Sequence, residues 1–200
     1  RKANGEIVLP SAFIEIAEDS GLIVEIGEWI WDEATTFVRS LNAGPQFSLA
    51  VNVAASQFNS NQHSAAAWLE MLKNKGVSPE SMVLEITERM MLNKSYRVIR
   101  KIEMMQEAGC KFSVDDFGTG YSSLSYLKRI PFDTMKIDQC FVNEISKLND
   151  DVLVKAIIAI GKNLHCKVIA EGVETEAELA VMKDVGVSHL QGFLFSRPMA

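Results

Sequence analysis

Acidic side chains follow short apolar runs of this sequence, at the points where predicted strands end. They are Glu85, Asp115, Asp116 and Glu171. A single acid in such a place is usually solvated, whereas several acids brought together repel one another unless cations neutralise them. Oxygen ligands without cysteine or histidine favour a hard ion such as Mg²⁺ or Mn²⁺. The adjacent pair Asp115–Asp116 suits two metal ions, with one carboxylate bridging them and the next reaching the second ion.

Two other polar residues, Asn52 and Lys136, also lie at the ends of predicted strands. Asn52 offers an amide oxygen as a further metal ligand, or a hydrogen bond that closes a turn. Lys136 stands two residues before Asp138, in the segment Met-Lys-Ile-Asp. In an acidic site its ammonium group would hold or deprotonate a metal-bound water, and the alternative is a salt bridge to Asp138 or to another neighbour.

A glycine-containing segment follows the paired aspartates, from Asp115 to Ser123. Gly118 and Gly120 permit a tight loop with positive φ angles directly after the strand. The serine and threonine side chains of the segment can anchor this loop or cap the next helix. Entry into a helix explains a lone glycine loop equally well, but glycines attached to a paired acid of metal-binding type are a stronger signal.

Apolar runs and amphipathic stretches alternate along the chain. The runs are too short for helices and indicate strands buried on both faces, as in a parallel sheet. They cover residues 47–52, 82–87, 111–116, 134–138, 167–172 and 189–193. The amphipathic stretches predict helices over residues 28–41, 65–74, 95–108, 151–163 and 176–185.

Several residues are typical of helix ends. Thr175 followed by Glu178 predicts a capping box at the start of the last helix. Gly76, Gly109 and Gly186 stand where helices should stop, each shortly before a predicted strand. These signals support the alternation of helices and strands.

Repeated strand–helix units predict an α/β fold, either a closed (β/α) barrel or an open doubly wound sheet. The polar residues favour the barrel, because the C-terminal ends of barrel strands converge on one mouth, where barrel enzymes place their active sites. In an open sheet these ends would be spread along a line. The residues expected at the mouth are Asn52, Glu85, Asp115, Lys136, Glu171 and Gln191.

The composition is that of a single folded domain. The 200 residues are 48% hydrophobic and 23% charged, which is enough for one core and argues against disorder. The net charge of −6 excludes a general DNA- or RNA-binding surface, but not an anionic substrate that reaches the acids through metal ions. The three scattered cysteines fit a reducing, cytoplasmic compartment. No apolar run is long enough to span a membrane, so we expect no membrane contact from this domain.

The motif set resembles the EAL-domain family. The segment DDFGTGYSSL carries the resemblance, with LEITE before it and KID, AEGVE and QGFLFSRP after it, and the likeness covers essentially the whole chain. It implies a modified TIM-type (β/α) barrel whose first strand is antiparallel. It also implies hydrolysis of cyclic di-GMP to linear pGpG by a two-metal phosphodiesterase mechanism with Mg²⁺ or Mn²⁺. The partner would be cyclic di-GMP, and a homodimer is compatible with the family.

The resemblance also implies roles for individual residues. Asn52, Glu85, Asp115, Asp116 and Glu171 match the metal ligands. Lys136 matches the lysine associated with the catalytic water, and Glu171 and Gln191 match positions close to the reacting groups. Glu88 matches the glutamate that steadies the Asp-Asp-Phe-Gly loop. Glu174 and Asp138 match supporting positions of the family's active site, and Arg1 matches a position near the substrate phosphate.

Two departures from the family pattern leave a second function open. The glutamate that names the family would lie about four residues before Arg1, outside this chain, and Ala54 and Ser56 replace a serine and an arginine of the family. The alternative is a degenerate module that binds cyclic di-GMP or a protein without turnover. An unrelated metal-dependent barrel would require every motif match to be accidental. We expect residues 1–200 to form one EAL domain, incomplete at its N-terminus, in a longer and potentially membrane-anchored protein with further N-terminal domains such as GGDEF.

Overall fold

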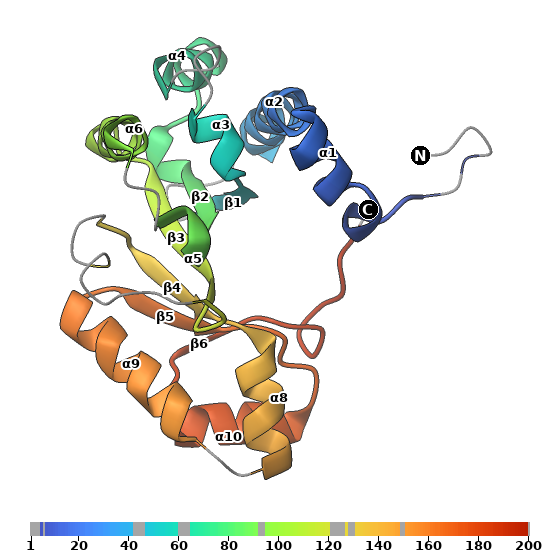
Figure 1. Cartoon of the computed structure of the whole chain (residues 1–200), viewed down its shortest axis with the longest axis vertical. Coiled ribbons are helices and arrows are strands. Elements are labelled where there is room, and N and C mark those ends of the chain that lie inside the picture. The colour runs from blue at the N-terminus through green and yellow to red at the C-terminus, as the bar shows by residue number, and fades with distance from the viewer. Residues whose placement is uncertain are drawn as a thin grey trace. The chain divides into compact units, whose positions relative to one another are not determined.

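A computed structural model describes most of the chain (Figure 1). The described residues are 5, 7–41, 47–59, 65–91, 95–120, 127, 131–148 and 151–199. They form two compact units. The first unit comprises Arg1–Leu84 and Ser95–Cys110, and the second comprises Glu85–Lys94 and Lys111–Ala200. Each unit is considered separately.

The first unit is mainly helical. Its elements are η1 (Pro10–Ala12), α1 (Ile14–Ser20), α2 (Ile23–Leu41), β1 (Leu49–Asn52), α3 (Ala55–Asn59), α4 (Ala65–Lys75), η2 (Pro79–Ser81) and α6 (Tyr96–Glu107). An aromatic cluster holds α2, α3 and α4 together. The rings of Trp31 and Trp68 stack with centroids 5.0 Å apart, and Phe58 meets Trp68 edge-on at 5.9 Å. All three side chains are buried, so this cluster is the centre of the unit's core.

The second unit contains most of the sheet. Strand β2 (Met82–Thr87) begins in the first unit and ends in the second. It is followed by α5 (Glu88–Met91), β3 (Lys111–Phe117), β4 (Thr134–Ile137), α8 (Gln139–Leu148), α9 (Val152–Leu164), β5 (Lys167–Ala170), α10 (Glu176–Asp184) and β6 (His189–Leu190). Helix α9 packs on β4 and β5, and α8 contacts α10 (Figure 1). Strands β4 and β5 are therefore covered by a helix of the same unit.

The strand order identifies the architecture. The six strands follow one another in chain order, β1-β2-β3-β4-β5-β6. The pairs β3–β4, β4–β5 and β5–β6 are parallel. A doubly wound sheet would reverse its order at a switch point, whereas consecutive parallel strands are the order found in a (β/α) barrel. The predicted α/β class and the barrel-type order are confirmed.

Most elements predicted from the sequence are present. The capping box is confirmed, because the Glu178 backbone N–H donates to Oγ1 of Thr175 while the Glu178 carboxylate accepts from the Thr175 backbone N–H. Gly76, Gly109 and Gly186 all have positive φ. The prediction missed the helices α1, α3, α5 and α8, and it began α2 at residue 28 rather than at Ile23. No helix in the described part of the chain is long and apolar enough to cross a membrane.

The capping box yields a stability prediction. Thr175→Ala removes the oxygen that accepts from the Glu178 N–H, so we expect the free energy of unfolding to fall by about 1 kcal/mol in urea titrations. Thr175→Ser is the matched control, because it keeps the hydroxyl, and most of the stability should remain. Equal losses in the two variants would show that the methyl group matters and the cap does not.

Candidate metal centre

The ammonium group of Lys136 on β4 lies among three carboxylates, which come from β2, β3 and the end of β5. Its Nζ is 2.9 Å from Oε1 of Glu85, 3.3 Å from Oδ1 of Asp115 and 2.5 Å from Oε1 of Glu171. The lysine is only 4% exposed. Strand β4 lies between β3 and β5, so the acids that end those two strands flank its lysine. The sequence left open whether Lys136 would pair with Asp138 or with another neighbour, and these three acids are its partners.

Burial and charge act against each other in this cluster. Burial alone would lower the pKa of Lys136, but the hydrogen bonds that it donates to Glu171 and Glu85 and the charges of Glu85 and Asp115 outweigh burial, so the pKa is raised. Burial raises the pKa of Glu171 to about 7, although the hydrogen bond and charge of Lys136 oppose this rise. One ammonium group cannot neutralise three carboxylates, and the cluster favours additional positive charge.

The backbone at the end of β3 brings Asp116 to the same cluster. Neighbouring side chains of a regular strand point to opposite faces, which would separate Asp116 from Asp115. Here the pairing of β3 with β4 is irregular between Val114 and Phe117, and Asp116 has a φ of 53°. A positive φ costs about 1–3 kcal/mol in a residue other than glycine and is held only where the surroundings enforce it. The strain therefore accompanies an arrangement that a regular strand could not give.

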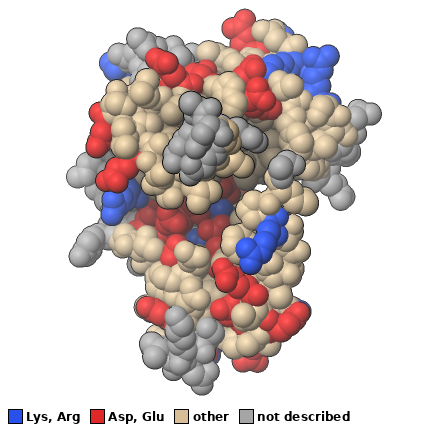
Figure 2. Space-filling model, turned by 90° about the vertical axis from the view of Figure 1, so that its right-hand side faces the viewer, with Lys and Arg blue, Asp and Glu red and all other residues tan. Residues whose placement is uncertain are grey.

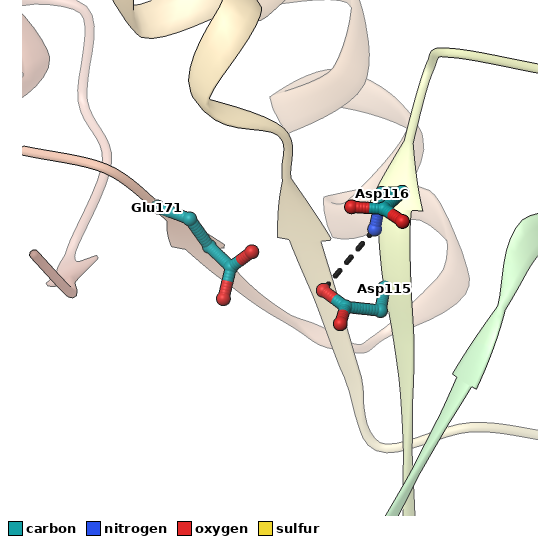
Figure 3. A group of neighbouring side chains, drawn as sticks. All are labelled: Asp115, Asp116 and Glu171. Atoms are coloured by element: carbon teal, nitrogen blue, oxygen red, sulfur yellow. Dashed lines mark hydrogen bonds between the residues drawn. The ribbon is translucent and has the colours of Figure 1, made fainter. Parts of the chain in front are cut away.

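Asp115, Asp116 and Glu171 each have a carboxylate oxygen within 4.8 Å of the others' (Figure 3). The backbone N–H of Asp116 donates to Oδ1 of Asp115 at 3.1 Å. The pKa of Asp116 is raised, mainly because the side chain is partly buried, and the charges of Asp115 and Asp138 raise it further. Acidic side chains also gather on one face of the molecule, with basic side chains among and beside them (Figure 2). An oxygen-only group with excess negative charge fits Mg²⁺ or Mn²⁺.

Glu88 fixes the loop that follows the aspartates. Glu88 is 3% exposed, and its Oε2 accepts the backbone N–H groups of Gly118 at 2.9 Å and Gly120 at 3.4 Å. Gly118 has the expected positive φ of 100°, but Gly120 does not have a positive φ. Gly120 is required for space instead, because a Cβ there would lie 2.8 Å from Oε1 of Glu88. The expectation for Gly120 was wrong because it considered backbone conformation and not the approaching side chain.

A polar pocket of about 290 Å³ lies beside the acid cluster. It is lined by Asp116, Asp138, Gln139, Glu171, Gly172, Glu174, Gln191, Gly192 and Phe193. Gln191 is held there by backbone bonds, with its N–H donating to the Ala170 carbonyl and its carbonyl accepting from Val173. Asp138 caps the following helix by accepting the Cys140 N–H at 2.8 Å. The structure thus places the predicted residues Asp138, Glu174 and Gln191 beside Asp116 and Glu171.

Sequence analysis missed Gln139, which also lines this pocket. A signal existed in Gly172, whose Cβ, if present, would lie 2.4 Å from the Cβ of Gln139. A glycine next to a strand-end acid can therefore mark the close approach of another side chain.

Two predicted site residues are not among the described residues of the second unit. Asn52 ends β1 in the first unit and is exposed beside a groove that Trp29 and Phe37 help to line. Arg1, and Tyr121–Ser123 of the glycine-containing segment, lie outside the described residues.

Comparison with known proteins gives a consistent result. The family model described as "EAL domain" matches residues 1–198. The chain is 40% identical over 200 residues to the bifunctional diguanylate cyclase/cyclic di-GMP phosphodiesterase MucR of Pseudomonas aeruginosa. The aligned region covers 96% of this chain and 28% of MucR. It is 37% identical over 195 residues to the cyclic di-GMP phosphodiesterase PdeR of Escherichia coli, covering 96% of this chain and 29% of that protein.

A solved structure shows the same fold. A MucR phosphodiesterase structure in complex with c-di-GMP matches with a TM-score of 0.91 and 38% identity, over 98% of this chain and 81% of that one. The match confirms the predicted TIM-like barrel class. The chain spans less than a third of the two curated relatives named above.

The lysine at the centre of the cluster yields a second prediction. Lys136→Met leaves three carboxylates without their cation, so in EDTA we expect the free energy of unfolding to fall by on the order of 3 kcal/mol. Added Mg²⁺ should reduce the difference in free energy of unfolding between Lys136→Met and the unmodified chain, because the ions replace the missing positive charge. The measurement is urea unfolding with EDTA and with Mg²⁺.

Lys155→Met is the matched control, because it removes a lysine from an exposed pair with Asp151. Its loss should stay below about 1 kcal/mol and be indifferent to Mg²⁺. If Lys136→Met and Lys155→Met are equally stable in EDTA, the acids do not depend on the ammonium group for their charge balance.

Proposed function

The chain belongs to the EAL-domain family, and from this membership we propose that it hydrolyses cyclic di-GMP to linear pGpG by a two-metal mechanism. The observation that carries the proposal is the convergence of Glu85, Asp115 and Glu171 on Lys136, with Asp116 beside them. Phosphodiester hydrolysis needs positive charge next to the phosphate and a positioned water, and an acid cluster that attracts divalent cations meets the first need. We also propose that the chain acts as one domain of a longer signalling protein, in keeping with the lengths of its relatives.

The proposed ligands of Mg²⁺ or Mn²⁺ are Asn52, Glu85, Asp115, Asp116 and Glu171. Carboxylate and carboxamide oxygens suit these hard ions, and the close approach of Asp115, Asp116 and Glu171 supports the assignment. When bound, such ions activate a water and stabilise negative charge on the phosphate oxygens. The acids themselves would hold the ions, and the ions would supply the positive charge next to the phosphate.

Lys136 is the residue to which we assign the orientation of the attacking water. In the structure its Nζ already donates to oxygens of Glu85 and Glu171. The same group can donate a hydrogen bond to a water held over the acid cluster, which fixes the direction of the oxygen lone pair. Burial keeps the lysine in place, since its side chain is only 5% exposed.

The remaining predicted residues would support binding. Glu88 holds the loop that follows Asp116, and in this loop Thr119 donates from its backbone N–H and its hydroxyl to the Asp116 carbonyl. Gln191, Glu174 and Asp138 line the adjoining pocket and offer polar atoms to the substrate or to water. Arg1 is assigned to a substrate phosphate by its match to the family pattern.

A substitution at Asp115 tests the proposal. Asp115→Asn removes one charge from the group that holds both ions, so we expect pGpG release to fall by on the order of 10²–10³, while cyclic di-GMP binding weakens much less. The measurements are pGpG release with Mg²⁺ and with Mn²⁺ in the full-length protein, calorimetric binding of cyclic di-GMP, and a thermal melt. Asp184→Asn, an exposed position at the end of α10, is the control and should leave turnover unchanged.

The competing interpretations predict different results. If Asp115 only anchors the glycine loop, the variant melts at a lower temperature but keeps its turnover per folded molecule. If the domain binds cyclic di-GMP without turnover, the unmodified protein releases no pGpG with either metal. Either result contradicts the proposed mechanism.

A further inference from the structure

The turn that follows Asn52 is closed by a buried glutamine. Strand β1 ends at Asn52, and helix α3 begins at Ala55. Between them, the Ala54 backbone N–H donates to Oε1 of Gln57 at 2.8 Å, and the Ala54 carbonyl accepts from the Gln57 backbone N–H at 3.0 Å. Both backbone polar groups of Ala54 are thus tied to one residue. Gln57 is only 4% exposed, which is unusual for a glutamine and indicates a specific task.

A glycine in another helix makes room for this carboxamide. Gly27 lies within α2, where a glycine costs about 1 kcal/mol relative to alanine. A Cβ on Gly27 would lie 1.7 Å from Nε2 and 2.3 Å from Cδ of Gln57, so no other residue fits there without moving the glutamine. The φ of Gly27 is not positive. Close approach of the Gln57 side chain therefore explains the glycine.

Helix α3 is held independently at its other end. Nζ of Lys101 donates to the Phe58 carbonyl at 2.7 Å, and the Phe58 ring packs edge-on against Trp68. A helix of five residues fixed at its C-terminal end gives Gln57 a firm base from which to hold Ala54. Ala54 is two residues from Asn52, so the Gln57 bond restrains the turn that directly follows Asn52.

We propose that Gln57 is a positioning residue, which together with Gly27 sets the direction of the Asn52 carboxamide for metal binding. This inference rests on the proposed function, in which Asn52 is a metal ligand. Residues that orient a ligand through hydrogen bonds commonly change metal affinity on the order of 10- to 100-fold when substituted. Gln57 would act through the backbone of the turn and would touch neither metal nor substrate.

The test compares the Mn²⁺ affinities of variants of the chain by calorimetric titration, with a thermal melt of each. Gln57→Met keeps the length of the side chain and removes the acceptor, and Gly27→Ala displaces the carboxamide from the opposite side. We expect each to weaken Mn²⁺ binding on the order of 10-fold. Gln57→Glu retains an acceptor oxygen and should restore most of the affinity. Gln57→Asn, whose carboxamide is too short to reach, replaces Gln57→Met if that variant does not fold.

Lys101→Met is the control for stability, because it loosens the far end of α3 and leaves the turn intact. It should lower the melting temperature and bind Mn²⁺ like the unmodified chain. If Gln57→Met, or Gln57→Asn in its place, melts lower but binds Mn²⁺ with unchanged affinity, Gln57 only packs the core and the inference is overturned. An unmodified chain that binds no Mn²⁺ overturns the proposed function as well, which is a distinct result.

Discussion

A buried ammonium group among carboxylates is the interaction on which the rest of the second unit depends. Lys136 cannot leave this position without exposing Glu85, Asp115 and Glu171 to one another, and the acids cannot lose Lys136 without becoming uncompensated charges. The interaction requires that the ends of four consecutive strands, β2 to β5, lie side by side. Only a sheet whose strands follow in chain order provides this, so the barrel-type order and the charge cluster belong together.

The same cluster explains why the local backbone is strained. One lysine leaves the group with excess negative charge, and the positive φ of Asp116 adds a further carboxylate instead of turning it away. Both features reduce the stability of the chain without metal. Such an arrangement persists where it has a function, and divalent cations held by these acids supply one. The hydrogen bonds from Gly118 and Gly120 to Glu88 maintain the loop that enforces it.

The sequence was sufficient to predict the class of fold and the convergence of the acids. Parallel strands place their C-terminal residues at one edge, so Glu85, Asp115 and Glu171 could be grouped from their positions alone. The capping box of Thr175 and Glu178 was also readable, because it depends on residues close in the sequence. The conformation of Asp116, the space that Gly120 gives to Glu88, and the place of Gln139 beside Gly172 depend on contacts between distant segments. Local patterns carry no information on these contacts.

Anomalous diffraction from crystals of the chain grown with Mn²⁺ tests the central claim most directly. The account predicts two Mn²⁺ peaks in contact with carboxylate oxygens of this cluster, with Asp115 shared between them and Lys136 displaced from at least one of its acids. An absence of any peak at Asp115 in saturating Mn²⁺, with Lys136 still paired to Glu85, Asp115 and Glu171, would contradict it. The acids would then be a structural ion cluster and not a metal centre.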